Sequence, residues 1–399
     1  MPHVIERLNT DAIGVSSEGV HIPRALPDET VEIGDDGSAK IITPSHQRVK
    51  PPCPHYKACG GCSLQHANDE FVAGWKVDVL RKALDTKSVD APDITTYTSP
   101  AQSRRRAKFS ATRTKKGAMV GFMAARSNIL IPISTCLVVD PKLVEALPTL
   151  EELTVEFASR KEVLGLQVTT SDDGLDVVID TDRPLTDALR QQLALFAQKN
   201  SLARLAWKDE VIVTIRQPAQ TFGSVTVVPP SGSFLQATPQ AEKMMAQTVI
   251  ECVGDATAVL DLFAGVGTFA LQLANTSKVH AVEGDAEMMA ALDTGWRKSS
   301  GLKHVSTETR DLFRRPLLPD EMAKFDVIVI DPPRAGAQAQ FTEIAQSNIA
   351  KVVSISCNPV SFARDAAILT GAGYRLRQLW VVDQFRWSSH IEVIGYFEK

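Results

Sequence analysis

The sequence predicts an α/β protein whose C-terminal part is a doubly wound parallel sheet, preceded by an α+β central domain and a short N-terminal β-barrel. Three observations support this prediction. From residue 239 onward, apolar strand-like segments alternate with helical segments, as in βαβ units. A glycine-rich segment, DLFAGVGTFA (261–270), follows the first of these strands, where such folds bind nucleotides. Three of the six cysteines fall within residues 53–62, which marks a separate small unit.

The length and composition limit the classes of protein to consider. A chain of 399 residues exceeds one ordinary core, so we expect two or three domains. The formal net charge of −4 gives no general attraction to nucleic acid, so such binding requires a local basic surface. No signal peptide and no run of about 18 apolar residues are present, so we expect a cytoplasmic protein without a membrane partner.

Residues 1–48 contain short apolar stretches separated by turns, which predicts a small β-barrel. Residues 49–238 contain both the alternating pattern of strands and the apolar spacing of amphipathic helices. A helix is expected over 71–84 and another over 185–200, with strands over 163–170, 175–180 and 211–215.

The stretch 103–117 (SRRRAKFSATRTKKG) carries seven basic residues with the alternation of a strand. We expect it to line cations along one sheet edge for phosphate contacts, or alternatively to form a solvated hairpin.

Residues 239–399 predict the doubly wound domain. A helix over 241–253 precedes strands over 258–263, 279–284, 325–331 and 351–356, which are separated by helical segments. The last two strands, 374–385 and 390–399, have no helix between them. They predict an antiparallel hairpin at the edge of the sheet.

Several residues are expected at the carboxyl edge of this sheet, where such folds bind ligands. The glycine loop fits NAD as well as S-adenosylmethionine. Glu283 ends a strand and is placed to accept hydrogen bonds from ribose hydroxyls. Alternatively, it is a surface acid in a turn. Asp311 and Asp331 occupy the ends of the third and fourth strands. Asp331 begins Asp-Pro-Pro, which is common in methyltransferases.

Cys357, in VSISCNPV (353–360), is expected at the same edge, although a buried structural cysteine is the alternative. A thiolate beside a methyl donor suits one acceptor, C5 of a pyrimidine. Addition of the thiolate to C6 makes C5 nucleophilic, and a base must then remove the C5 proton. Glu392 is the candidate base, with His390 as a possible assistant. Alternatively, Glu392 is a solvent-facing residue of an edge strand.

The cysteine cluster consists of Cys53, Cys59 and Cys62, with Cys136 as a remote fourth thiol. Four thiolates suit an iron-sulfur cluster or a structural zinc ion. A single C-x2-C with irregular partners favours the iron-sulfur cluster, and a Cys59–Cys62 redox pair is a third possibility.

Together these motifs resemble the uracil-C5 RNA methyltransferases, in particular the iron-sulfur branch that modifies 23S ribosomal RNA. The resemblance rests on CPHYKACGGCSLQH (53–66), SFLQ (233–236), DLFAGVGTF (261–269), DPPRAG (331–336), SCNP (356–359) and HIE (390–392). It covers nearly the whole chain, with the motifs in the family's order.

The resemblance implies a monomeric RNA-binding enzyme with three parts: a shortened TRAM-like (OB) domain over 1–48, an iron-sulfur and central domain over 49–238, and a class I methyltransferase domain over 239–399. Cys357 would be the nucleophile and Glu392 the base. The implied S-adenosylmethionine site comprises Gln236, Phe263, Thr268, Glu283, Asp311 and Asp331. The implied [4Fe-4S] ligands are Cys53, Cys59, Cys62 and Cys136.

Two departures and three rivals accompany this hypothesis. The N-terminal barrel is short, so RNA contacts could move to the basic stretch, and Thr268 stands where the ribosomal enzymes often have Asn. The same reaction on transfer RNA, a nicotinamide-dependent oxidoreductase and a non-catalytic RNA-binding or assembly factor are the alternatives.

Overall fold

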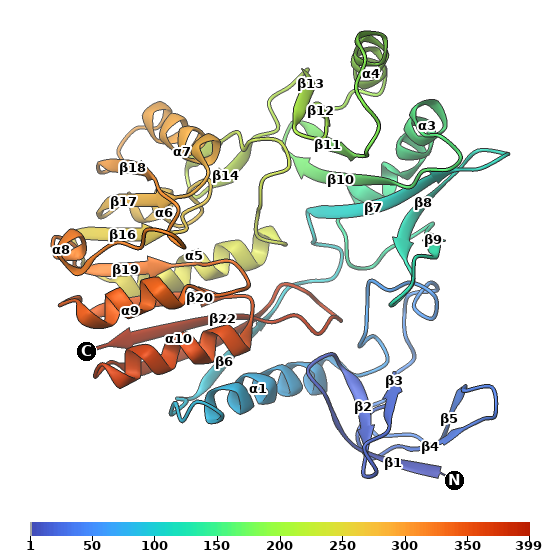
Figure 1. Cartoon of the computed structure of the whole chain (residues 1–399), viewed down its shortest axis with the longest axis horizontal. Helices are drawn as coiled ribbons and strands as arrows, with labels where there is room; N and C mark the ends of the chain where they lie inside the picture. The colour runs from blue at the N-terminus through green and yellow to red at the C-terminus, as the bar shows by residue number, and fades with distance from the viewer. Residues whose placement is uncertain (1) are drawn as a thin grey trace.

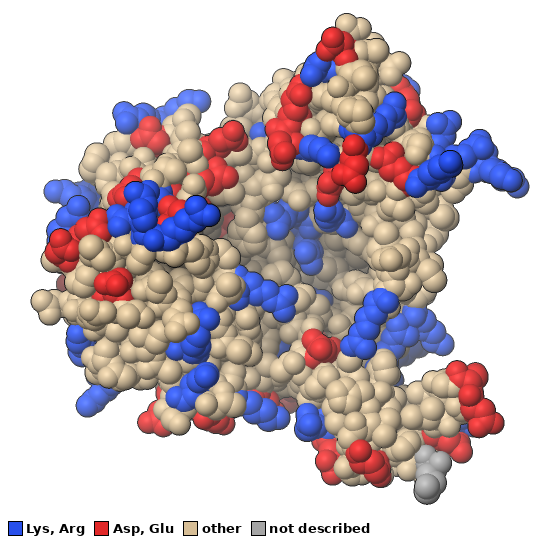
Figure 2. Space-filling model, viewed as in Figure 1, with Lys and Arg blue, Asp and Glu red and all other residues tan. Residues whose placement is uncertain are grey.

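The computed structural model describes residues 2–399 and arranges them in three lobes around a hollow (Figures 1 and 2). The C-terminal half of the chain forms the largest lobe. The central residues form a second lobe beside it, and the N-terminal strands form a third.

The N-terminal lobe is a five-stranded antiparallel sheet with the order β3-β2-β1-β4-β5. Its strands are β1 (Pro2–Leu8), β2 (Ile13–Ser16), β3 (His21–Pro23), β4 (Thr30–Ile33) and β5 (Ala39–Thr43). Among residues 2–399 no pairing joins β3 to β5, so the predicted barrel is open at this seam.

The central lobe is a seven-stranded sheet with the order β13-β12-β11-β10-β7-β8-β9. Its strands are β7 (Arg106–Arg113), β8 (Ala118–Met123), β9 (Leu130–Pro132), β10 (Leu164–Ser171), β11 (Gly174–Asp180), β12 (Arg204–Trp207) and β13 (Glu210–Thr214). Helices α2 (Pro141–Glu145), α3 (Leu147–Phe157) and α4 (Asp187–Lys199) belong to this lobe. Apolar side chains of α3, α4 and the strands share one core.

The C-terminal lobe is an eight-stranded sheet with the order β18-β17-β16-β19-β20-β22-β21-β6. Its strands are β6 (Ile94–Thr98), β16 (Ala258–Leu262), β17 (Lys278–Glu283), β18 (Val305–Thr309), β19 (Val327–Ile330), β20 (Lys351–Ser356), β21 (Arg375–Asp383) and β22 (Glu392–Glu398). Its helices are α1 (Asp69–Asp85), α5 (Pro239–Val253), α6 (Ala270–Leu273), α7 (Ala286–Lys298), α8 (Pro319–Met322), α9 (Gln338–Gln346) and α10 (Pro359–Gly371). A short hairpin, β14 (Gln220–Phe222) and β15 (Val225–Val227), packs against α7.

Strands β16 to β20 are parallel, as the alternating pattern predicts. Their central residues are buried on both faces, because separate apolar cores cover the two sides of the sheet. Strands β21 and β22 form the predicted antiparallel hairpin.

The hairpin does not lie at the edge of the sheet, which corrects the prediction. Strand β6 pairs in parallel with β21 and forms the outermost strand instead. Helix α1 also packs on α10, so residues 69–98 belong to the C-terminal lobe (Figure 1). The sequence assigned these residues to the central domain, and the division into three domains stays a prediction.

Helix α1 forms where the apolar spacing predicts it. Asn68 caps its start by accepting a hydrogen bond from the Phe71 amide, over 2.8 Å. The buried Val72 and Trp75 pack against the N-terminal lobe, whereas the buried Leu80 packs into the core of the C-terminal lobe.

The basic stretch does not line a sheet edge, because β7 lies between β10 and β8. Its members also face different surroundings. Arg105 is buried and forms an ion pair with Glu242, whereas Lys108 is exposed and pairs with Asp180 over 2.7 Å. The predicted position at a sheet edge is therefore wrong, while the predicted hairpin is present and the phosphate contacts stay a prediction.

No helix within residues 2–399 has the length and apolar character needed to cross a membrane.

Candidate active site

A cavity of about 530 Å³ opens at the carboxyl edge of the C-terminal sheet. Eight of its lining residues are the ones predicted from the sequence: Gln236, Phe263, Thr268, Glu283, Asp311, Asp331, Cys357 and Glu392. The structure therefore brings the proposed donor-site residues, the thiol and the carboxylic acid to one place.

The topology explains this convergence. Phe263, Glu283, Asp331 and Cys357 each lie at or directly after the end of a parallel strand, and these ends share one edge. Strand β22 runs in the opposite direction, so its first residue, Glu392, reaches the same edge.

The glycine loop after β16 approaches the cavity with its backbone. Phe263, Gly265 and Gly267 have φ values of 60°, 56° and 95°. At Gly267 a Cβ atom would lie 2.8 Å from Leu271 Cδ1, so only glycine fits there. The Gly265 amide donates to Glu283 Oε2 over 3.2 Å, which ties the loop to the end of the next strand.

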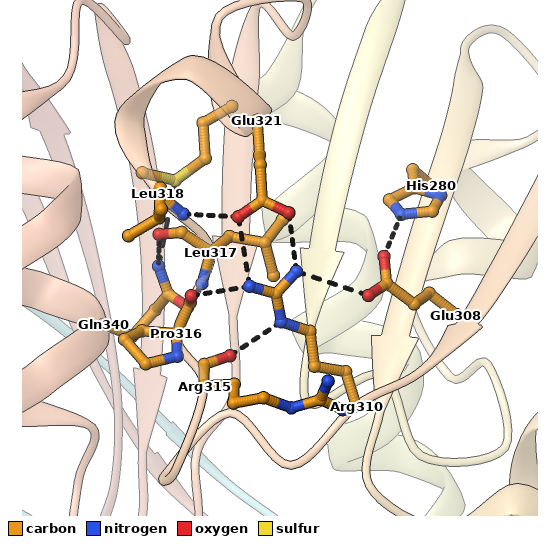
Figure 3. A network of polar contacts seen from close by, with 10 residues as sticks. His280, Glu308, Arg310, Arg315, Pro316, Leu317, Leu318, Glu321 and Gln340 are labelled. Atoms are coloured by element: carbon orange, nitrogen blue, oxygen red, sulfur yellow. Dashed lines mark hydrogen bonds and ion pairs between the residues drawn. The ribbon is translucent and has the colours of Figure 1, made fainter.

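Asp311 is held by its own loop. Its Oδ1 accepts hydrogen bonds from the Phe313 and Arg314 amides, over 3.0 and 3.3 Å. Directly before it, Arg310 forms the centre of the network in Figure 3. Its guanidinium donates to both carboxylate oxygens of Glu321, over 2.6 and 3.0 Å, and to the Arg315 carbonyl over 2.7 Å. This bidentate pair fixes the loop that carries Asp311.

The two C-terminal motifs are joined directly. Asn358 caps α10 by accepting from the Val360 amide over 3.1 Å, and its Nδ2 donates to the Arg334 carbonyl over 3.1 Å. Ser361 Oγ donates to the same carbonyl over 3.2 Å. The Asp331 loop and the Cys357 turn are therefore one rigid unit.

A chain of amides connects the two buried carboxyl groups. Gln384 Nε2 donates to Glu392 Oε2 over 2.7 Å and to Gln236 Oε1 over 2.8 Å. Gln236 Nε2 in turn donates to Asp331 Oδ2 over 3.2 Å. The Ala237 amide donates to Gln384 Oε1 over 2.6 Å, which sets the orientation of that side-chain amide.

Burial and mutual repulsion control the charges of these groups. Burial raises the pKa of Glu392 to about 8, and the Asp331 carboxylate adds to this effect. Burial also raises the pKa of Asp331 to about 7, against the hydrogen bond from Gln236. The pair therefore titrates near neutral pH, where one carboxyl can hold a proton while the other is ionised.

The Cys357 thiol is half-buried at the turn between β20 and α10. Burial, together with repulsion from the carboxylates of Glu392 and Asp331, raises its pKa to about 11. Without a ligand the sulfur is therefore a thiol, and a positive charge placed in the cavity would favour the thiolate.

The comparisons with known proteins agree with this geometry. A family model described as tRNA (Uracil-5-)-methyltransferase matches residues 296–399. A relative in Brucella suis, described as an uncharacterized RNA methyltransferase, is 41% identical over 400 residues, which cover 97% of this chain and 96% of the relative. The 23S rRNA (uracil(1939)-C(5))-methyltransferase of a Shewanella species is 31% identical over 427 residues, which cover 99% of this chain and 94% of the relative.

This chain belongs to the RNA uracil-C5-methyltransferase family. It is therefore an enzyme that methylates RNA at uracil C5, and the oxidoreductase and non-catalytic alternatives are excluded. The tRNA (uracil-54, C5)-methyltransferase of Pyrococcus abyssi, solved with S-adenosyl-L-homocysteine, has the same fold. The TM-score is 0.76 at 21% identity, covering 100% of this chain and 99% of that one.

Sequence reasoning missed two residues near this RNA methyltransferase site, neither of which lines the cavity itself. Gln384 connects Glu392 to Gln236, but its position in the chain carries no motif that predicts this. Asp261 begins the glycine loop and is fully buried, with no hydrogen-bond partner for its carboxylate oxygens among residues 2–399. Burial and the nearby Asp331 carboxylate raise the pKa of Asp261 well above its usual range. Its position before the glycines was the available signal.

The four predicted cluster cysteines also meet, at a separate cavity of about 260 Å³. Cys53, Cys59, Cys62 and Cys136 all line it, among apolar side chains and Arg104. Burial raises the pKa of Cys62 to about 12, and the neighbouring sulfurs add to this. Within residues 2–399 no three potential ligands are close enough to hold a metal ion, and no disulfide joins the cysteines.

Proposed function

We propose that the enzyme transfers a methyl group from S-adenosylmethionine to one uridine of 23S ribosomal RNA, with Cys357 as nucleophile and Glu392 as base. The single observation that supports this assignment is the shared cavity. A thiol and a carboxyl group line one pocket at the nucleotide-binding edge of the sheet.

The donor site would consist of Gln236, Phe263, Thr268, Glu283, Asp311 and Asp331. A volume of about 530 Å³ suits a ligand of this size. The rings of Phe263 and Phe313 lie 5.4 Å apart and offer an apolar surface for adenine. Glu283 is placed to accept a hydrogen bond from a ribose hydroxyl. A carboxylate can accept about four hydrogen bonds, and the loop amides donate only three to Glu283. S-adenosylmethionine supplies an electrophilic methyl group with a positive charge.

The chain's own residues carry the remaining chemistry. The Cys357 thiolate adds to C6 of the uracil, and the electron pair of the C5–C6 bond moves onto C5 and the C4 oxygen. C5 would take the methyl group as the bond between that carbon and the donor's sulfur breaks, and the electron pair of that bond would stay on sulfur in S-adenosylhomocysteine. The Glu392 carboxylate then removes the C5 proton, which restores the double bond and expels the thiolate. Gln384 holds Glu392 in place for this step.

The experiment that tests this mechanism uses RNA with 5-fluorouridine at the target position. Fluorine cannot leave as a cation, so the unmutated enzyme should form a stable adduct through Cys357. Cys357→Ala should give no adduct while still binding S-adenosylhomocysteine. Glu392→Gln should accumulate an adduct with ordinary uridine. Absence of adduct from the unmutated enzyme with methylatable RNA would refute the mechanism.

The substrate proposal rests on the Shewanella relative, which acts on 23S rRNA by its name. Transfer RNA is the alternative substrate, because the matching family model bears that name. Mapping the 5-methyluridine that disappears from total RNA of a deletion strain distinguishes the two. Loss from 23S rRNA supports the proposal, and loss from transfer RNA contradicts it.

We also propose a [4Fe-4S] cluster on Cys53, Cys59, Cys62 and Cys136. Four thiols around one cavity match the donor set of such a cluster. The single C-x2-C with two irregularly spaced partners favours such a cluster over structural zinc. Anaerobically purified enzyme should be brown with stoichiometric iron and sulfide. A colourless protein containing zinc would contradict this proposal.

The three-domain division, with the N-terminal sheet as an RNA-binding domain, the monomeric state and the cytoplasmic location remain predictions.

A further inference from the structure

A second cavity meets the proposed active site at its nucleophile. It has a volume of about 600 Å³ and lies between the β1–β2 turn, helix α1 and the start of α10. Cys357 and Arg334 line both this cavity and the donor cavity. Cys357 is therefore accessible from two sides, and only one side is needed for the donor.

The second cavity has a locally positive rim. Arg7, Lys82, Lys87 and Arg334 line it and are exposed, and none of them forms an ion pair within residues 2–399. The acids on the same lining are Asp11 and Asp78. Since the whole chain carries a net charge of −4, this surplus of unpaired cations is a local feature. Unpaired cations at a cavity favour an anionic ligand.

The start of helix α10 adds to this positive field. Asn358, Pro359 and Val360 line the cavity, and the positive end of this 13-residue helix favours phosphate.

The lining also contains apolar side chains. Trp75 and Val79 are among them. Val360 lies at the same cavity with 63% of its surface exposed. A ligand with a charged backbone and flat apolar rings fits such a surface.

We propose that this second cavity binds the RNA backbone and the base next to the target uridine. The inference rests on the proposed function, because it places the uridine at Cys357. A uridine inserted there stays linked to its neighbours, so the chain must leave beside the nucleophile. The second cavity begins at that sulfur and has the charge to neutralise phosphates.

The first test measures RNA binding after charge removal. The substrate is an unmodified transcript of the RNA that loses its 5-methyluridine in the deletion strain. A Cys357→Ala background prevents reaction during the measurement. Lys82→Gln with Lys87→Gln should weaken binding about tenfold at low salt, and each lysine lost should reduce the slope of log K against log salt by about 0.7.

The matched control removes two charges outside the cavity. Arg81→Gln lies on the same helix as Lys82, and Lys298→Gln lies in the last turn of α7, as Lys82 does in α1. This control should keep the affinity and the salt slope of the parent. Equal affinities and slopes for the two double variants would overturn the proposal.

The second test locates the RNA. A photocrosslinking phenylalanine in place of Val360 should crosslink to nucleotides adjacent to the target uridine. The same group in place of Leu195, which is 67% exposed on α4, should not. Crosslinks from position 360 that map elsewhere, or none at all, would refute the second cavity as the RNA site.

In the lysine variants with Cys357 intact, the 5-fluorouridine adduct should still form at saturating RNA. If the unmutated enzyme forms no adduct with this RNA, the proposed function is refuted instead of the second cavity.

Discussion

The two buried carboxyl groups of the site show how a few amides can set protonation. Glu392 and Asp331 would repel each other if both were ionised, and burial makes each charge costly. Gln384 and Gln236 lie between them and donate one hydrogen bond to each carboxylate. Hydrogen bonds from amides favour the ionised forms, which a proton acceptor requires.

Gln384→Met should test this arrangement, because methionine has a similar size without the N–H donor. The pKa of Glu392 should rise, so less of it is ionised at pH 7. The release step should slow about tenfold there and recover at higher pH, since one unit of pKa changes the ionised fraction about tenfold. Release of the adduct formed with ordinary uridine, measured between pH 6 and 10, checks this.

Gln384→Glu provides a contrasting variant, because it also removes the amide donor but adds a carboxylate, whose repulsion should raise the pKa of Glu392 further. A uniform loss of rate at every pH in Gln384→Met would contradict the proposed role and indicate only a packing defect.

At the scale of elements, the turn between β21 and β22 is held by a segment from the other end of the chain. Lys76 of α1 is fully buried and forms an ion pair with Asp383 over 2.8 Å. Its ammonium also donates to the His390 carbonyl over 2.8 Å. Because Gln384 and Glu392 flank this turn, α1 supports the proposed base from outside the sheet.

Lys76→Met should destabilise the enzyme by about 3–5 kcal/mol, because it leaves the Asp383 carboxylate buried without a partner. Chemical denaturation followed by circular dichroism measures this change. Lys76→Met combined with Asp383→Asn removes both charges and should recover much of the loss. An unchanged free energy of unfolding in the single variant would show that the pair has no structural role.

At the scale of the whole molecule, the cysteine segment joins the N-terminal half to the active-site turn. The amides of Ser63 and Leu64 donate to the Trp387 carbonyl, over 2.8 and 3.0 Å. Trp387 itself has a φ of 61°, a conformation that a non-glycine residue keeps only when its surroundings hold it. The cysteine segment therefore supports the turn that carries Gln384.

Cys62→Ser should lower the melting temperature and make residues 53–66 sensitive to proteolysis, because the proposed cluster would lose a ligand. Cys252→Ser is the control, since Cys252 is buried outside the cysteine cavity. Limited proteolysis with mass spectrometry, together with thermal melting, measures both variants. Equal protection of residues 53–66 in both would argue against a cluster that clamps this segment.

Much of the fold and of the candidate site follows from local patterns. Cys357, Asp331 and Glu283 each follow or end a strongly apolar strand, so their place at one sheet edge was predictable. Strand β6 was not, because ITTYT has no pattern that pairs it with β21, where Leu379 lies opposite Ile94. Arg105 was grouped with free cations, although Glu242 of a distant helix pairs with it.

By itself, the sequence determined the catalytic edge: which strands alternate with which helices, and which polar residues follow each strand. Periodicity and adjacency are local, so they can be read without coordinates. Only the tertiary structure decided that Gln384 bridges Glu392 and Gln236, that Lys76 supports the turn beside them, and that a second cavity reaches Cys357. Gln236 and Gln384 are 148 positions apart, and contacts over such distances depend on how whole elements pack.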